Sequence, residues 1–352
     1  MIPVMPRAVS RRAVLGALVG VGGATLLAGC DEQDPRTPLS PTEGVRADDP
    51  ATWLPDTQLF IAVRQRVHGY RLALDVVAGR ERTRDRLAEL WRVQQERLEL
   101  LITLGGVPLP DLLDDPAVAG PGDGTSAPAD GSGDRGVDGT TATGGADAEG
   151  STSTGAGPAR PDAEVLGRVL RRDHTEACRE LSTATATNVP TLASLAAQHV
   201  AAAAWLGAPV PWGEMAGPSD AAAVPVLAVA RPAVFGLEVV AARSRDEERA
   251  DYESVLEPLR SVTRQLATLA GAAAPVAPLG YDLPEPLETA EQRRALARRL
   301  VADIAPATLE AAQRLPGRAA ELTGVVRVVS DTVVWDRALG TRALPFPGMT
   351  LP

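Results

Sequence analysis

The 352-residue chain has a formal net charge of −10 and 45% hydrophobic residues, and at about 150 residues per domain its length predicts two domains. Much of the hydrophobic content is alanine and only 3% of the residues are aromatic, which favours helices and excludes an aromatic-rich β-sandwich. The acidic balance excludes a generic nucleic-acid-binding protein, which needs clustered Lys and Arg. All 35 basic residues are Arg, which we interpret as compositional bias rather than phosphate recognition.

Residues 1–29 are typical of a bacterial lipoprotein signal peptide. A basic segment ends at Arg11 and Arg12, an apolar run covers 13–28, and small residues precede Cys30. This order predicts cleavage before Cys30 and a diacylated anchor on the extracytoplasmic face of the cell membrane. The apolar run is short for a span of about 20 residues, which argues against the alternative of an uncleaved membrane anchor.

The basic segment bears on the export route. Residues 10–15, which contain Arg11 and Arg12, resemble a twin-arginine signal. Both the Sec and the Tat route stay open, because many Sec signals also carry two arginines. After cleavage Cys178 has no intramolecular cysteine partner, which excludes a disulfide framework. We expect Cys178 to be a small buried apolar residue.

Two polar segments carry most of the negative charge. Residues 30–50 form an expected disordered tether with six acidic residues and two arginines. Residues 111–162 form an expected disordered insertion with ten acidic residues and two arginines. Such segments cannot bury a core, so the folded parts are nearly neutral. We interpret the charge as solvation of linkers, with an acidic interaction tail as the alternative.

The remaining chain predicts an all-α protein, with four amphipathic segments before Trp212 and four after Pro218. Apolar residues recur at spacings of three and four, which places them on one side of each helix. In 84–104 this stripe is Leu87, Leu90, Trp91, Gln94, Leu98 and Leu101. In 163–181 it is Leu166, Leu170, His174, Ala177 and Leu181, and in 190–206 it is Leu192, Leu195, His199, Ala203 and Leu206.

The two halves align with each other without gaps inside each hairpin. A shift of 130 residues matches Leu166 with Leu296, Leu170 with Leu300, Ala177 with Ala307, Leu192 with Leu322 and Trp205 with Trp335. A shift of 165 matches Tyr70 with Phe235, Leu72 with Leu237, Leu101 with Leu266 and Gly106 with Gly271. The shared register predicts an internal repeat of two four-helix bundles, 51–212 with the insertion and 219–352. Chance matching of alanine-rich helices is the alternative.

Residues 224–352 also carry a family resemblance. The matching stretches are 234–243, 280–287, 297–300 and 346–349, of which Tyr281-x-Leu283-Pro284 and Phe346-Pro347-Gly348 are the most distinctive. On these residues the second half resembles a ferritin-like domain-of-unknown-function family of actinobacterial exported proteins and lipoproteins. The resemblance implies a ferritin-like four-helix bundle and no known activity. An acidic residue and a His that relatives often carry on the first helix are here Ala230 and Arg231.

A ferritin-like fold raises the question of metal. Di-iron sites in such bundles need Glu from two helices and Glu-x-x-His from the other two. The sequence contains no Glu-x-x-His, and its second half contains no His, which argues against a di-iron oxidase. His174 and His199 lie on the predicted stripes of neighbouring helices, and with Glu176, Cys178 or Glu96 they are weak candidates for an atypical metal site.

We favour a simpler interpretation of these histidines. Their repeat partners are Ile304 and Val329, so both positions are expected to be interior, with the imidazoles hydrogen-bonded in the core. His68 is expected to face solvent. We therefore predict a non-enzymatic, lipid-anchored binding or scaffolding module of the cell envelope. It would have no cofactor, an unknown envelope protein or ligand as partner, and no nucleic acid. The alternative is a metal-binding or redox protein built on His174 and His199.

Overall fold

The computed structural model describes residues 53–114, 161–283 and 286–350, and these belong to one compact unit, 47–352. The predicted signal peptide and tether, with Arg11, Arg12 and Cys30, lie outside the described residues, as does the insertion between 115 and 160. The part that is described is all-helical and contains no strand, as predicted from the sequence.

The helices follow one another along the chain as four before Trp212 and five after Pro218. The first four are α1 (Thr57–Val76), α2 (Glu81–Leu104), α3 (Ala163–Leu181) and α4 (Val189–Trp205). The others are α5 (Asp220–Ala242), α6 (Asp246–Ala270), α7 (Ala290–Ala302), α8 (Ile304–Ala312) and α9 (Ala319–Ala338). A short 3-10 turn, Gly271–Ala273, follows α6.

One predicted segment after Pro218 is therefore two helices, α7 and α8. The break falls at Asp303, and Pro306 lies in the first turn of α8. Proline has no N–H to donate to the carbonyl of Ala302, and its ring clashes with that carbonyl in a continuous helix. The expectation of one uninterrupted helix missed the consequence of this proline.

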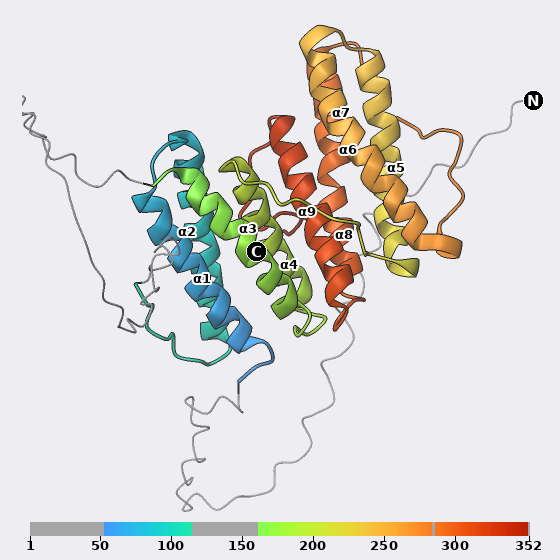
Figure 1. Cartoon of the computed structure of the whole chain (residues 1–352). Helices are drawn as coiled ribbons and strands as arrows, with labels where there is room; N and C mark the ends of the chain where they lie inside the picture. Colours follow the sequence, from blue (N-terminus) through green and yellow to red (C-terminus); the bar gives the residue numbers. More distant parts are fainter. Residues whose placement is uncertain (1–52, 115–160, 284–285, 351–352) are drawn as a thin grey trace, which may run out of the picture. The chain divides into compact units, whose positions relative to one another are not determined.

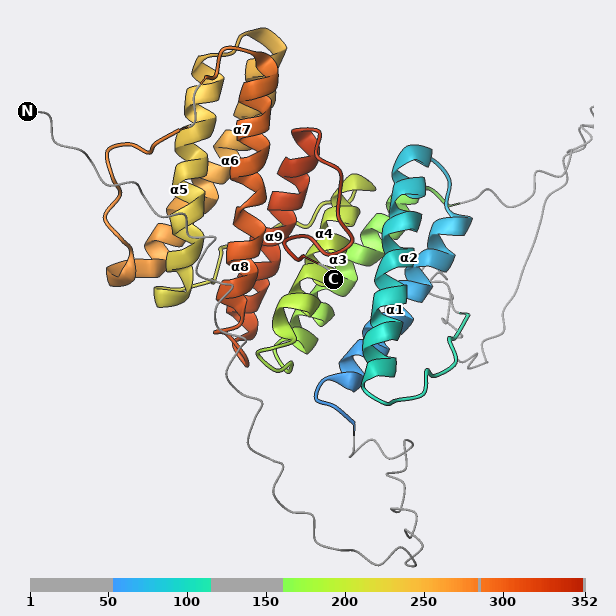
Figure 2. The same cartoon turned by 180° about the vertical axis from the view of Figure 1, so that it is seen from behind.

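Neighbouring helices pack in pairs that meet along α4 and α9. Helix α1 lies against α2, α3 against α4, and α5 against α6, α7 and α8, while α4 packs along α9 (Figures 1 and 2). The buried core around α1–α4 continues into α8, α9 and Phe346. A second core joins α5, α6, α7 and α9 and includes Met215. The predicted bundles thus share an extensive interface.

The segments that follow α4 and α9 each cross onto the other half. After α9, the carbonyls of Pro345 and Pro347 accept hydrogen bonds from Gln94 of α2 and Ser194 of α4. After α4, the carbonyl of Gly213 accepts a hydrogen bond from Arg327 of α9. The two crossings join the halves by hydrogen bonds from side chains to backbone carbonyls.

The described ends of the predicted insertion 111–162, residues 111–114 and 161–162, contact α1 and the turn after it. The side chain of Gln65 bonds both backbone groups of Leu113, and Asp114 contacts His68 at 3.1 Å. At the other end Asp162 pairs with Ala78 in an isolated bridge and caps the N-terminus of α3.

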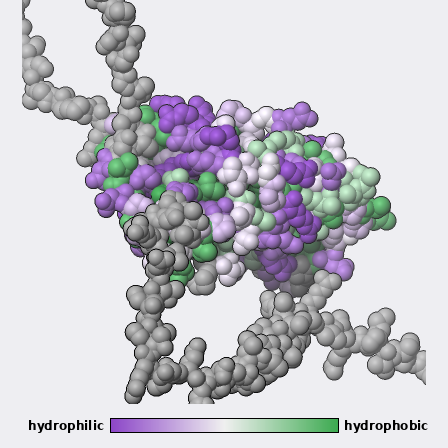
Figure 3. Space-filling model, turned by 90° about the horizontal axis from the view of Figure 1, so that it is seen from below, coloured by the Kyte–Doolittle hydropathy of each residue, from purple (hydrophilic) through white to green (hydrophobic). Residues whose placement is uncertain are grey.

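Two observations concern possible contact with a membrane: the hydropathy of one face of the molecule and the apolar helix α5. Figure 3 shows this face, with hydrophilic side chains over most of it and smaller hydrophobic patches between them. Among the described helices, α5 is long and apolar enough to cross a membrane by length and composition. Its contacts with α6, α7 and α8 give its apolar residues partners inside the fold, and 44% of its most apolar window is buried.

Candidate functional site

His199 lies in the interior of the first four helices. Its ring projects from α4 toward α1 and α2, with ring centroids 5.2 Å from Tyr70 and 6.2 Å from Trp91. Its Nε2 is 3.1 Å from Oε1 of Gln94, so Nε2 carries the proton and donates it to that carbonyl oxygen. Burial, helped by the nearby Arg66 charge, lowers the pKa of His199 to about 3. The imidazole is therefore neutral at physiological pH.

Two glutamines continue the hydrogen-bond network from His199. The amide nitrogen of Gln94 donates to Oε1 of Gln198 at 3.1 Å and to the carbonyl of Pro345 at 2.6 Å. Trp91 Nε1 donates to the same Gln198 oxygen at 3.0 Å. Among the described residues, Nε2 of Gln198 is left without a hydrogen-bond partner. The network joins α2, α4 and the C-terminal segment, and it leaves His199 no open face toward a ligand on the Gln94 side.

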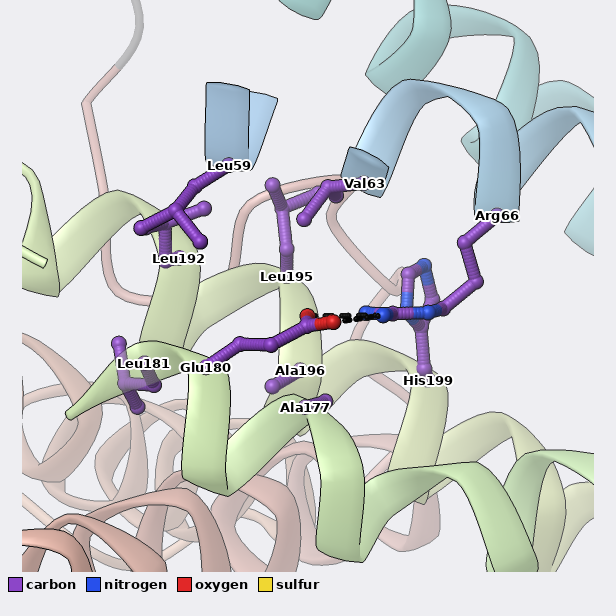
Figure 4. Close-up of a pocket in the computed structure, with 10 residues that line it drawn as sticks. All are labelled: Leu59, Val63, Arg66, Ala177, Glu180, Leu181, Leu192, Leu195, Ala196 and His199. Atoms are coloured by element: carbon purple, nitrogen blue, oxygen red, sulfur yellow. Dashed lines mark hydrogen bonds and ion pairs between the residues drawn. The ribbon is translucent and has the colours of Figure 1, made fainter. Parts of the chain in front are cut away.

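The other side of His199 borders a small cavity (Figure 4). Its volume is about 20 Å³, which is room for about one water molecule. Figure 4 shows the Arg66 guanidinium and the Glu180 carboxylate meeting across it, beside the His199 ring. Two hydrogen bonds of 2.7 and 2.8 Å join Arg66 of α1 to Glu180 of α3. Both bonds come from the same guanidinium nitrogen, Nη2, which donates to the two carboxylate oxygens. The ion pair closes the cavity with opposite charges that satisfy each other.

Tyr70 completes the polar interior. Its hydroxyl donates to Oδ2 of Asp173 at 3.1 Å. Burial, together with the negative charge of Asp173, holds the pKa of Tyr70 well above its usual range. The phenol is therefore protonated and acts as a hydrogen-bond donor between α1 and α3.

His174 has different neighbours from His199. It is half-buried on α3, its Nδ1 contacts the carbonyl of Arg171 one turn back, and its ring meets Trp212 edge-on at 5.5 Å. The described residues contain no group of three or more His, Cys, Asp or Glu placed to hold a metal ion. The proposed supporting ligands are engaged elsewhere, since Glu176 pairs with Arg179 and Glu96 with Arg92.

Two further expectations concern single side chains. Cys178 is buried as predicted, and burial raises the pKa of its thiol to about 11, so the thiol is protonated and unreactive. His68 does not face open solvent, because its side chain is only 16% exposed and lies against Asp114. Leu101 was placed on the buried stripe of α2, but it is 40% exposed and Ile102 is buried instead. In the last turn of this helix the buried position is therefore one residue later than the sequence predicts.

No protein-family model matches the chain, and no curated protein or solved structure matches it either. The likeness of residues 224–352 to a ferritin-like family therefore stays a prediction from the sequence.

Sequence reasoning named His199 but missed most of its partners. Gln94 was on the predicted stripe, and a polar amide among leucines is the signal that it bonds inside the core. Gln198, Tyr70 and the Arg66–Glu180 pair gave no such signal, since which helix faces which is a property of the fold and not of a single helix.

Proposed function

We propose that the protein is a lipid-anchored, extracytoplasmic helical protein that serves as a non-enzymatic binding or scaffolding module in the cell envelope. Acylated Cys30 would hold it to the membrane, and an envelope protein or ligand would be its partner. The lipoprotein signal motif that ends at Cys30 supports the location.

One observation carries the non-enzymatic part of this proposal. His199, the buried one of the two candidate histidines, uses its Nε2–H on Gln94 and packs between Tyr70 and Trp91. A metal ligand needs a lone pair directed at an accessible ion. The 20 Å³ cavity beside His199 is already bridged by Arg66 and Glu180, so the Glu180 carboxylate is engaged and is not free to hold a cation.

We further propose that α1–α4 and α5–α9 are two copies of one ferritin-like unit. The ends of α4 and α9 support a repeat. Ala208 N–H donates to the carbonyl of Ala203, and Thr341 N–H donates to that of Asp336, across the same five-residue step. The intervening Gly207 and Gly340 both have positive φ, 99° and 80°, a conformation that suits glycine. Helix α9 is three residues longer than α4, so the match shifts from 130 residues at the start of the helix to 133 at its end. At that shift Trp205 aligns with Ala338 and not Trp335, so the gap-free register expected from the sequence does not hold to the end of this helix.

The anchor is tested by membrane fractionation and by incorporation of labelled palmitate. Cys30→Ala is expected to lose the label and to leave the membrane fraction. Cys178→Ala is the matched control, because it removes the other cysteine of the chain, and it should stay labelled and membrane-bound. Label in the Cys30→Ala protein, or its full retention in membranes, would contradict the proposal.

The alternative, an atypical metal or redox site at His174 and His199, is tested by metal analysis of the purified protein. The proposal expects no stoichiometric transition metal in the parent. A stoichiometric metal that disappears in the His174→Ala, His199→Ala double variant would establish the alternative. Because the rings of His174 and His199 face Trp212 and Gln94 respectively, such a site would need both side chains to turn away from their present partners.

A further inference from the structure

An open cavity lies at the C-terminal end of α9, beside the segment whose Pro345 carbonyl accepts a hydrogen bond from Gln94. It has a volume of about 250 Å³ and is bounded by α8, α9 and the segment that follows α9. Val333, Pro306, Leu344 and Met349 give it apolar walls. Its polar lining residues are Asp336, Thr341, Arg342 and Thr350. The volume lies just below the range of about 300–1,000 Å³ that is typical of small-molecule pockets, so it suits a ligand of few heavy atoms.

Two polar side chains of this cavity each have a buried atom without a partner. Oδ1 of Asp336 and Oγ1 of Thr341 are buried, and neither has a hydrogen-bond partner among the described residues. The backbone ties the two residues together, because Thr341 N–H donates to the Asp336 carbonyl at 2.8 Å. Leaving a buried polar group unsatisfied costs about 1–3 kcal/mol, so the Asp336 oxygen is an acceptor in need of a donor, and the Thr341 hydroxyl can accept a second bond from the same donor group.

We propose that this cavity binds a small aliphatic ammonium ion, whose charged group bonds to the Asp336 carboxylate and the Thr341 hydroxyl while its hydrocarbon part packs on Val333, Leu344 and Met349. The inference does not depend on acylation of Cys30 or on the state of the histidines.

The charges around the cavity favour a cation. The carboxyl of Asp336 lies in the last turn of α9, where the carbonyl ends of the helix give a partial negative charge. The cations nearby are already engaged, since Arg342 bonds Glu89 and Arg298 bonds the carbonyl of Leu339. Burial without a paired cation raises the pKa of Asp336 to about 7. A bound ammonium ion would supply the missing positive partner and favour the ionised carboxylate.

The test compares three probes with a short straight hydrocarbon chain on the full chain of the protein: n-butylammonium, 1-butanol and butyrate. Binding is followed by chemical-shift changes in two-dimensional NMR spectra up to about 50 mM probe, the range expected for ligands of about five or six heavy atoms. The Asp336→Asn variant keeps the size of the side chain and removes its charge. Asp331→Asn is the matched control, because it makes the same change on the same helix outside the cavity.

Butylammonium is expected to bind with shifts at Val333, Leu344 and Met349, at least tenfold more tightly than 1-butanol. Asp336→Asn should weaken it by tenfold or more, Thr341→Val by a smaller factor, and Asp331→Asn by less than twofold. The proposal is overturned if no probe binds, if butyrate or 1-butanol binds as well as butylammonium, or if Asp336→Asn binds like the parent.

Discussion

The two halves of the helical unit bury their polar side chains in different ways. In α1–α4 they form hydrogen bonds between helices. Trp91 and Gln94 of α2 donate to Gln198 of α4, and His199 of α4 donates to Gln94. In α5–α9 the buried hydroxyls turn back to the carbonyl four residues earlier in their own helix, as in Thr263, Thr308 and Thr332.

The difference determines what each half requires of its neighbours. A hydrogen bond between helices fixes their pairing and register, because a slip of one turn would leave several buried groups unsatisfied. A hydroxyl bonded to its own helix makes no demand on the next helix. The polar bonds between helices of this half are ion pairs nearer the surface, such as Arg293 of α7 with Glu248 of α6, and its buried interior is positioned mainly by apolar packing. We therefore expect α1–α4 to be sensitive to loss of single polar groups and α5–α9 to be tolerant.

The largest expected effect is that of Gln94→Leu. This change removes the acceptor of His199, the donor to the Pro345 carbonyl and one donor to Gln198. At about 1–3 kcal/mol for each stranded buried group, the free energy of unfolding should fall by about 3–5 kcal/mol, measured by urea denaturation.

Thr332→Val is the matched change in the other half. The Thr332 hydroxyl bonds only the Val328 carbonyl of its own helix, and valine has nearly the same shape. We expect a change within about 1 kcal/mol. If Gln94→Leu and Thr332→Val lower the free energy of unfolding equally, the proposed difference between the two halves is wrong.

Asp336→Asn concerns a carboxyl of α9 whose Oδ1 bonds neither to another helix nor to its own. The folded-state pKa is about 7 against 3.8 for an ordinary Asp, so between these values the native protein holds a proton that the unfolded chain releases. Stability from this group is therefore lost as pH rises from about 4 to 7 and stays lost above it. At pH 8 Asp336→Asn should raise the free energy of unfolding by about 2 kcal/mol, less than the full linkage value of about 4 kcal/mol because the amide is also unpaired.

The corresponding measurement is urea unfolding of parent and Asp336→Asn at about pH 5 and pH 8. The variant should exceed the parent in free energy of unfolding by less at the lower pH, where the parent carboxyl is protonated. A difference that grows as the pH falls would contradict the raised pKa of Asp336.

His199→Val tests a pKa shift in the first half that makes stability depend on pH in the opposite direction. At neutral pH it strands the Gln94 carbonyl oxygen, which should cost about 1–3 kcal/mol. The pKa of His199 is about 3 in the fold against 6.5 ordinarily, so below pH 6.5 the unfolded chain takes up a proton that the native protein does not. The parent should lose up to about 1.4 kcal/mol per pH unit from this group as pH falls, and the variant should lack that part of the slope. Parallel pH profiles for the two proteins would show that His199 is not buried in its neutral form.

The smallest expected effect comes from shortening the acidic insertion. Its described ends contact His68 and Ala78, which lie about 15 Å apart along α1 at 1.5 Å per residue. A Gly/Ser linker of about ten residues in place of 115–160 spans that distance. Because loop-closure entropy changes slowly with length, we expect the melting temperature to shift by less than about 3 °C. A larger drop in differential scanning calorimetry would show that the insertion contributes to the packed core.

The sequence predicted the helical class and most helix positions well, because leucines at spacings of three and four mark each buried stripe. It placed Leu166, Leu192 and Leu206 inside, where they are buried. It did not predict the break between α7 and α8, which falls just before Pro306. It also placed Leu101 in the core, whereas this side chain is exposed. It found His199 but not Gln198 or Arg66, since those contacts depend on how α1, α2 and α4 pack against one another.

The imidazole of His199 gives the most direct test of the central claim that α1–α4 are held by a hydrogen-bonded polar core rather than built around a ligand site. The chain has three histidines, so their ring nitrogens can be assigned in ¹⁵N NMR spectra with His199→Val as the reference. The account predicts that His199 stays neutral with the proton on Nε2 down to about pH 4, and that added Zn²⁺ leaves its signals unchanged. Protonation near pH 6.5, or a shift of its ring nitrogens on addition of Zn²⁺, would contradict it.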